Sequence, residues 1–213
     1  MSQPVIYGPA LSTYVRTVRL VLAEKQVEHE LVEIDLMGGA HRAPEHVARH
    51  PFGKVPTLAH GEVTLYETGA ITRYLDLAFP EVPLTPSEPR QVGLMAQAIS
   101  VADSYAYPAM VGTVVIQRLL MPMLGRPSDE AAIQAALPEV ERCLAAFDAM
   151  LEGQVWLSGG DLGLADLHLA PMIGAFLHTP EAASVLQHHP NVQRWWGGME
   201  NRASMAATAP QLG

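Results

Sequence analysis

A proline-rich segment divides this chain into two parts with different secondary-structure patterns. Residues 80–89 contain four prolines, and proline removes a backbone donor that helices and central strands need. Before this segment, short β-branched runs alternate with helical patterns, whereas only helical patterns follow it. The sequence therefore predicts an α/β domain over residues 1–79, a linker over residues 80–89 and an all-helical domain over residues 90–213.

The first part has strand and helix signals in the order βαβ-α-ββα. A short strand at residues 5–7 ends at Gly8-Pro9, and the polar–apolar alternation of residues 30–35 fits a half-buried strand. His60-Gly61 separates two further strand-like runs, as in an antiparallel hairpin. These runs cover residues 55–58 and 62–66, and the helical patterns cover residues 13–26, 44–49 and 68–79. The order predicts a compact α/β unit with one parallel crossover and one hairpin.

The second part has the pattern of a helical bundle. One helical pattern runs through residues 91–120 and tolerates Pro108, and two others cover residues 164–177 and 191–202. Between them, an apolar stripe from Ile133 to Leu151 repeats at steps of three and four residues. Ser128 is predicted to cap that helix, and Pro138 is predicted either to bend it or to mark a break in it.

Composition narrows the class of protein. The chain has 213 residues, of which 49% are hydrophobic, enough for a globular core without disulfides. A net charge of −9 without any basic run disfavours nucleic-acid binding, and the low charged fraction of 16% suggests that a partner covers some of the surface. The N-terminus has no signal-peptide pattern, and no apolar run approaches the roughly 20 residues of a membrane span. We therefore expect a cytoplasmic protein that does not bind membranes.

Four short segments contain residues that suit a binding site, although each also has a purely structural interpretation. Ser12 or Thr13 is either an N-cap or a hydroxyl that stabilises an anion at the positive end of a helix. Thr68 has the same two interpretations at the start of another helix. Pro56 either begins a strand or forms one of the rare cis bonds. The His41-Arg42 pair is either solvated or neutralises an anion.

Neither the nine histidines nor the single cysteine forms a recognisable metal or nucleophile pattern. His46 and His50 are four residues apart but have no third ligand nearby in the sequence, so we interpret the histidines as surface residues and predict no metal site. Cys143 lies on the inward stripe of its helix, where a buried, inert thiol is the commoner role.

Taken in order, these segments resemble the glutathione transferases, most closely the phi class and its bacterial relatives. The run from Ser12 to Arg16 resembles the phi serine followed by Thr and, four positions on, by Arg. His50-Pro51-Phe52-Gly53-Lys54-Val55-Pro56 resembles the Asn-Pro-Phe-Gly-Lys-Val-Pro stretch of that class, and residues 121–125 and 164–168 resemble stretches of its C-terminal domain. The resemblance runs from Val5 to about residue 205. It implies a thioredoxin-like N-terminal domain followed by a helical bundle.

The chain departs from the phi pattern at three positions. Leu11 lengthens the loop before Ser12 by one residue, so Thr13 remains a rival for the role of thiol donor. Thr68 replaces the usual serine and keeps the hydroxyl. Gly163 stands where Ser or Thr normally caps the helix that carries Asp166, a difference of only a few tenths of a kcal/mol in stability.

The resemblance also implies roles for individual residues toward glutathione as co-substrate. The γ-glutamyl carboxylate would meet Thr68, with Glu67 near the ammonium group, and the cysteinyl residue would pair with the backbone of Val55, held by a cis Pro56. The glycyl carboxylate would face the basic side chains of His41, Arg42 and Lys54. The wall for a hydrophobic electrophile would consist of residues that are equally compatible with an ordinary core: Leu11, Tyr107, Met110, Val111 and Val114.

The activity implied by the resemblance is conjugation of glutathione to hydrophobic electrophiles, a detoxification reaction in which Ser12 stabilises the thiolate. A glutathione-dependent isomerase or an organic hydroperoxide peroxidase needs only the same activated thiolate and remains an alternative, as does a non-catalytic binding module. Disulfide exchange is disfavoured because no Cys precedes Cys143. The resemblance further implies a homodimer with Phe52 as an anchor in its interface.

Overall fold

The computed structural model describes residues 2–210 and divides them into two compact units. The first unit comprises the chain up to Leu84 together with the segment that begins at Asn201, and the second comprises Thr85–Glu200. The boundary at Leu84 falls within the segment predicted as a linker. The predicted helical domain covers residues 90–213, whereas the described residues from Asn201 onward belong to the first unit.

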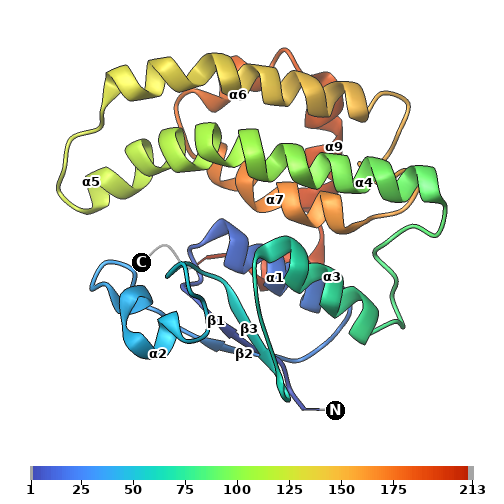
Figure 1. The fold of residues 1–213 in the computed structure, drawn as a ribbon. Coiled ribbons are helices and arrows are strands. Elements are labelled where there is room, and N and C mark those ends of the chain that lie inside the picture. Colours follow the sequence, from blue (N-terminus) through green and yellow to red (C-terminus); the bar gives the residue numbers. More distant parts are fainter. Residues whose placement is uncertain (1, 211–213) are drawn as a thin grey trace. The chain divides into compact units, whose positions relative to one another are not determined.

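The first unit contains a four-stranded sheet in the order β2-β1-β3-β4 (Figure 1). Its strands are β1 (Val5–Tyr7), β2 (Glu30–Val32), β3 (Thr57–His60) and β4 (Val63–Tyr66). β2 lies parallel to β1, while β3 is antiparallel to both β1 and β4. The predicted parallel crossover and hairpin are therefore confirmed, although β2 is shorter than its sequence pattern indicated.

Two amphipathic helices of the first unit, α1 (Thr13–Glu24) and α3 (Thr68–Ala78), pack against each other beside the sheet (Figure 1). Their apolar stripes drive this packing, because the side chains of Val15, Val18 and Leu75 are completely buried. Two short elements, η1 (Ala40–Arg42) and α2 (Pro44–Val47), lie between β2 and β3 in the chain.

The Lys25 ammonium group explains why the first unit extends to Leu84. Lys25, just after α1, forms an ion pair with Asp76 at 2.7 Å and donates to the carbonyl oxygens of Phe79 (2.9 Å) and Val82 (2.6 Å). Asp76 in turn accepts a hydrogen bond from the backbone N–H of Leu84 at 2.9 Å. The first half of the proline-rich segment is thus tied to α1 and α3.

The last described helix, α10 (Ala203–Ala207), packs against α1. Arg202 donates to Glu24 at 2.7 Å, and Ser204 also donates to that carboxylate. Arg16 in α1 donates to the carbonyl oxygen of Met205 at 3.0 Å. Both ends of the chain therefore contribute to the first unit.

The second unit is entirely helical among its described elements, as predicted. A continuous helix consists of α4 (Pro89–Val101), the π-helical η2 (Ala102–Leu120) and α5 (Met121–Met123), and α6 (Glu130–Met150) runs alongside it (Figure 1). The remaining helices are α7 (Leu164–Phe176), α8 (Ala182–Leu186) and α9 (Pro190–Glu200). By length and composition alone, the helix Pro89–Met123 could cross a bilayer, but core helices of globular proteins share this property. In this structure the helix packs against α6 and α7.

Two helix starts differ from the predicted caps. Asp129, not Ser128, caps α6, because its carboxylate accepts the N–H of Ala132 at 2.9 Å while the Ser128 hydroxyl donates to the carbonyl of Gln117 at 2.7 Å. Thr68 is the first residue of α3, and Glu67 occupies the N-cap position without any side-chain capping bond. α6 continues through Pro138.

Candidate active site

The start of α1 presents a hydroxyl group whose hydrogen is not used by the fold. Ser12 is the N-cap of α1, and its Oγ accepts the N–H of Val15 at 3.4 Å. That bond occupies a lone pair, so the Ser12 O–H still has a hydrogen to donate, and no acceptor for it occurs within residues 2–210. Ser12 is half-buried, whereas Thr13 is only 9% exposed. Of the two rivals, Ser12 is therefore the more accessible.

Gly8, directly after β1, lets the start of α1 approach Val55. A Cβ at Gly8 would lie 2.5 Å from the Val15 side chain and 3.1 Å from the Cβ of Val55, and the φ of Gly8 is +151°. Glycine is the one residue that accepts both this backbone conformation and this crowding. Three features consequently lie together: the end of β1, the start of α1 and Val55.

The backbone of Val55 is unpaired at this place. The Val55–Pro56 peptide bond is cis, so that prediction is confirmed. The N–H and C=O of Val55 have no hydrogen-bond partner in the described part of the chain, and regular strand pairing begins only at Thr57. An unpaired N–H donor and C=O acceptor on the same residue can pair with an extended peptide in the manner of one more strand.

The predicted basic side chains lie close together in the chain's tertiary structure. η1 carries His41 and Arg42, and a Cβ at Gly53 would lie 3.1 Å from the His41 carbonyl oxygen. Lys54 follows Gly53, and both Arg42 and Lys54 are exposed. His41, Arg42 and Lys54 thus form a basic edge next to Val55, where they can neutralise an anion.

The start of α3 is open to a ligand. Glu67 has a φ of +69° and contributes no capping bond. The first-turn N–H groups of Thr68, Gly69 and Ala70 find no acceptor within the described residues, and neither does the Thr68 hydroxyl. Unsatisfied N–H groups at the positive end of a helix form a site for a carboxylate.

The interpretation of the histidines as surface residues is wrong for several of them. His46 and His50 are each 2% exposed, and the rings are stacked with centroids 6.4 Å apart. His60, His168 and His189 are also buried. Burial lowers the pKa of His50, against an opposing effect of Glu67. Among residues 2–210, no group of three metal-ligating side chains occurs.

The residues predicted to contact an electrophile differ in exposure. Leu11 is 50% exposed, whereas Met110, Val111 and Val114 in η2 are buried. Tyr107 is partly exposed, and burial raises its pKa. Cys143 in α6 is buried as predicted, and burial raises the pKa of its thiol to about 11, which keeps it protonated and inert.

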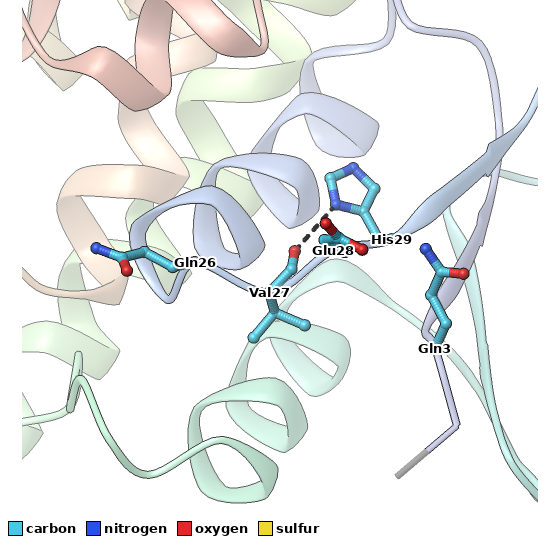
Figure 2. A pocket seen from close by; sticks show the side chains of 5 residues that line it. All are labelled: Gln3, Gln26, Val27, Glu28 and His29. Atoms are coloured by element: carbon cyan, nitrogen blue, oxygen red, sulfur yellow. Dashed lines mark hydrogen bonds between the residues drawn. The ribbon is translucent and has the colours of Figure 1, made fainter.

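A surface pocket of about 450 Å³ lies at the opposite end of α1 from Ser12. It is lined by Gln3, Gln26, Val27, Glu28 and His29 (Figure 2). These side chains point in different directions, and the His29 ring donates to the carbonyl oxygen of Val27 at 3.4 Å. The pocket contains none of the predicted site residues and has no convergent polar groups.

Comparison with known proteins matches both parts of the chain. The model of the glutathione S-transferase N-terminal domain matches residues 6–77, and that of the C-terminal domain matches residues 113–203. A probable glutathione S-transferase, GSTF2, from Oryza sativa subsp. japonica is 33% identical over 208 residues, with 96% of this chain and 94% of the relative covered. Glutathione S-transferase 4 from Zea mays is 32% identical, with 92% and 87% covered.

Solved structures agree with the sequence relatives. Glutathione transferase F7 from Populus trichocarpa superposes with a TM-score of 0.88 at 30% identity and 97% coverage of both chains. Glutathione S-transferase I from maize, solved with an atrazine–glutathione conjugate, superposes with a TM-score of 0.85 at 31% identity, covering 98% of this chain and 97% of the other.

The chain belongs to the glutathione S-transferase family. Within that family it is an enzyme, a glutathione transferase, and its relatives support the predicted resemblance to the phi class. The predicted fold, a thioredoxin-like α/β domain followed by a helical bundle, is confirmed as well.

Proposed function

We propose that this protein conjugates glutathione to hydrophobic electrophiles and that the Ser12 hydroxyl stabilises the reacting thiolate. The observation that carries the proposal is the Ser12 side chain, which accepts the N–H of Val15 while its own hydrogen has no acceptor in the described structure. Its structural role as a cap and its chemical role as a donor are therefore compatible. Leu11, exposed beside it, offers an apolar contact for the electrophile.

Glutathione would bind as an extended peptide across three features of the first unit. The cysteinyl residue pairs with the free N–H and C=O of Val55, beside Pro56. The γ-glutamyl carboxylate meets the open start of α3 at Thr68, with Glu67 toward the ammonium group, and the glycyl carboxylate faces the basic edge. That edge consists of His41, Arg42 and Lys54.

The chemistry follows from ionisation of the thiol. A free thiol has a pKa of roughly 8.5, so most of it is a poor nucleophile at neutral pH. A drop of two pKa units corresponds to about 2.7 kcal/mol, which one charge-assisted hydrogen bond and a helix N-terminus can supply together. Ser12 remains protonated throughout. The thiol proton leaves to solvent, and the thiolate attacks an electrophilic carbon of the second substrate. The C–S bond forms as the leaving group departs or, with an activated alkene, as the electron pair moves to the adjacent carbon, which then takes a proton from water.

The electrophile would be a small apolar molecule. The atrazine conjugate bound to the maize relative supports this class, and Leu11, which is 50% exposed, is the apolar side chain proposed to contact it. The same activated thiolate would also serve an isomerase or a hydroperoxide peroxidase. Assays with a chlorinated nitroaromatic, an organic hydroperoxide and a maleyl-type substrate distinguish these activities.

The active form would be a cytoplasmic homodimer. Phe52 supports this assembly, because it is 70% exposed beside the rings of His50 and Tyr66 at the edge of the first unit. An exposed aromatic anchor of this kind suits a partner pocket. Light scattering is expected to give twice the chain mass of 23.0 kDa, and a mass of one chain at micromolar concentration would contradict a dimer.

The experiment that tests Ser12 is its replacement by alanine, with Thr13→Ala as the matched control. If Ser12 is only an N-cap, Ser12→Ala lowers the free energy of unfolding by about 1 kcal/mol and leaves turnover unchanged. As a thiolate donor, Ser12→Ala raises the pKa of bound glutathione and lowers kcat/KM at neutral pH about 5- to 150-fold. Activity then partly recovers at alkaline pH, where the thiol ionises unaided. A thiol pKa that moves only in the Thr13 variant would transfer the role to Thr13, and an unchanged pKa in both variants would exclude a hydroxyl donor.

A further inference from the structure

A buried histidine holds the peptide unit that precedes the unpaired backbone of Val55. His46 lies in α2 and is 2% exposed, and its Nε2 is 2.7 Å from the carbonyl oxygen of Lys54. Because a carbonyl oxygen can only accept, Nε2 carries a hydrogen and donates it. The other ring nitrogen, Nδ1, is buried and has no partner among residues 2–210. The single polar contact of this imidazole is therefore directed at Lys54.

The Lys54 carbonyl and the Val55 N–H belong to the same planar peptide group. The Lys54–Val55 bond is trans, so its C=O and N–H point in opposite directions and cannot rotate independently. A hydrogen bond that fixes the carbonyl on one side also fixes the direction of the N–H on the other. The bond further polarises the peptide, which strengthens donation by that N–H.

We propose that His46 is a positioning residue for glutathione. Its imidazole holds the Lys54–Val55 peptide so that the Val55 N–H faces the cysteinyl carbonyl of the bound tripeptide. The inference rests on the proposed contact of Val55 with glutathione. It adds a residue that never touches the ligand and acts through one peptide plane.

The neighbouring His50 is buried by packing alone, in contrast to His46. His50 is equally buried, and its ring lies 4.9 Å from that of Tyr66, but its side chain makes no hydrogen bond to the Lys54–Val55 peptide. The Gly53 N–H donates to the backbone carbonyl of His50 at 2.8 Å, a contact that is independent of the side chain. Replacing the His50 ring therefore perturbs the packing around His46 without removing the hydrogen bond that holds the Lys54–Val55 peptide.

The first experiment compares binding and turnover in three variants of the full-length protein. His46→Phe keeps the ring volume without a donor, and His46→Gln keeps an amide N–H at about the reach of Nε2. His50→Phe is the packing control. We expect His46→Phe to raise the KM for glutathione about 5-fold with kcat at saturating glutathione nearly unchanged. His46→Gln should stay within about twofold of the natural protein, and His50→Phe should lower the Tm without changing this KM.

The second experiment tests whether His46 acts through the Val55 N–H, by removing the ligand group that this N–H would contact. Calorimetry measures binding of S-methylglutathione and of its analogue in which the cysteinyl carbonyl is reduced to a methylene group. If His46 acts through the Val55 N–H, His46→Phe weakens binding of S-methylglutathione but not of the reduced analogue, which has no acceptor for that N–H. His46→Asn, whose shorter amide does not reach Lys54, gives the same comparison if the Phe variant does not fold.

The outcomes separate this inference from the proposed function. Failure of the natural protein to bind S-methylglutathione would overturn the proposed function and this inference with it. Binding by the natural protein, with equal losses for both ligands in the His46 variants, would leave the function intact and reduce His46 to a packing residue. Equal KM values for the natural protein and His46→Phe would overturn the inference as well.

Discussion

The starts of α7 and α3 use the same backbone chemistry in opposite ways. At α7, the carboxylate of Asp166 accepts hydrogen bonds from the N–H groups of Gly163 (2.9 Å) and Leu157 (2.8 Å) and from the Trp195 ring (2.8 Å). Asp166 is completely buried. At α3, Glu67 makes no capping bond, and the first-turn N–H groups have no acceptor among the described residues.

This difference is the basis for a division between groups that hold the fold and groups that we propose to bind glutathione. A helix start whose donors are satisfied by the protein has nothing left to offer a substrate, and its loss should appear in stability. A helix start whose donors are free contributes little to the free energy of unfolding, and its loss should appear in binding.

The largest effect is expected from Asp166→Ala at the closed helix start. The change leaves three buried N–H donors without an acceptor, so the free energy of unfolding should fall by about 3–5 kcal/mol. Urea unfolding followed by circular dichroism measures the loss. Asp161→Ala, which removes an exposed carboxylate two residues before Gly163, should change stability by less than about 0.5 kcal/mol. A small loss for Asp166→Ala would mean that water replaces the carboxylate at α7.

The next effect concerns the pH dependence of stability. Burial raises the pKa of Asp166 to about 6, although the N–H groups of Leu157 and Gly163 and the Trp195 ring oppose the shift. In the unfolded chain the pKa is about 3.9. Between these values the native state binds a proton that the unfolded state has released, so the contribution of Asp166 to stability falls as pH rises from about 4 to 6.

The measurement is the difference in unfolding free energy between the natural protein and Asp166→Asn, which cannot titrate there. This difference should decline by about 1–3 kcal/mol across that window. A difference that is flat or that increases with pH would show that the hydrogen bonds, rather than burial, control this carboxylate.

At the open helix start, Thr68→Val should affect binding more than folding. The hydroxyl has no partner in the described structure, so the free energy of unfolding should change by less than about 0.5 kcal/mol, while the KM for glutathione rises about 2- to 10-fold. Thr72→Val is the matched control, because that hydroxyl donates to the Gly69 carbonyl at 3.2 Å. It should lower stability and leave KM unchanged, and the reverse pattern would contradict the division.

The smallest effect is expected from Gly163→Ser. Gly163 has an extended backbone, φ −135° and ψ 179°, which any residue adopts. A serine there adds a capping hydroxyl to a start that Asp166 already closes, so the stability should rise by only a few tenths of a kcal/mol. A gain above about 1 kcal/mol would show that α7 still lacks a capping acceptor.

Periodicity predicted the longer helices correctly, because most of them bury one face, whereas the short helices η1, α8 and α10 are too short to show a period and were not predicted. The ends of elements were less predictable, since they depend on local competition. Residues 33–35 have the alternation of a strand, yet β2 stops at Val32 and the Asp35 carboxylate accepts the N–H of Gly38 at 2.8 Å in a turn. Ser128 and Asp129 are both good caps, and the nearby Gln117 carbonyl decides between them.

The sequence proposes site residues where the residue type itself carries the chemistry, as at Ser12, Lys54 and Thr68. It gives no sign of the contact between His46 and the Lys54 carbonyl, because no sequence pattern reveals a partner eight residues away. A usable signal existed in the spacing of His46 and His50, which places both rings on one side of a helical turn directly before Pro51. This spacing was considered only as a possible metal-ligand pattern and not as a sign that both rings are buried.

The first unit is built from two stretches of the sequence that are separated by Thr85–Glu200, and this discontinuity has a consequence for engineering. The partners of Glu24 and Arg16 in α1 lie at Arg202 and Met205, beyond the continuous stretch that forms the second unit. A fragment ending at Leu84 would expose the face of α1 that α10 covers. Joining residues 201–210 to that fragment, by a fusion or a circular permutation, should restore it.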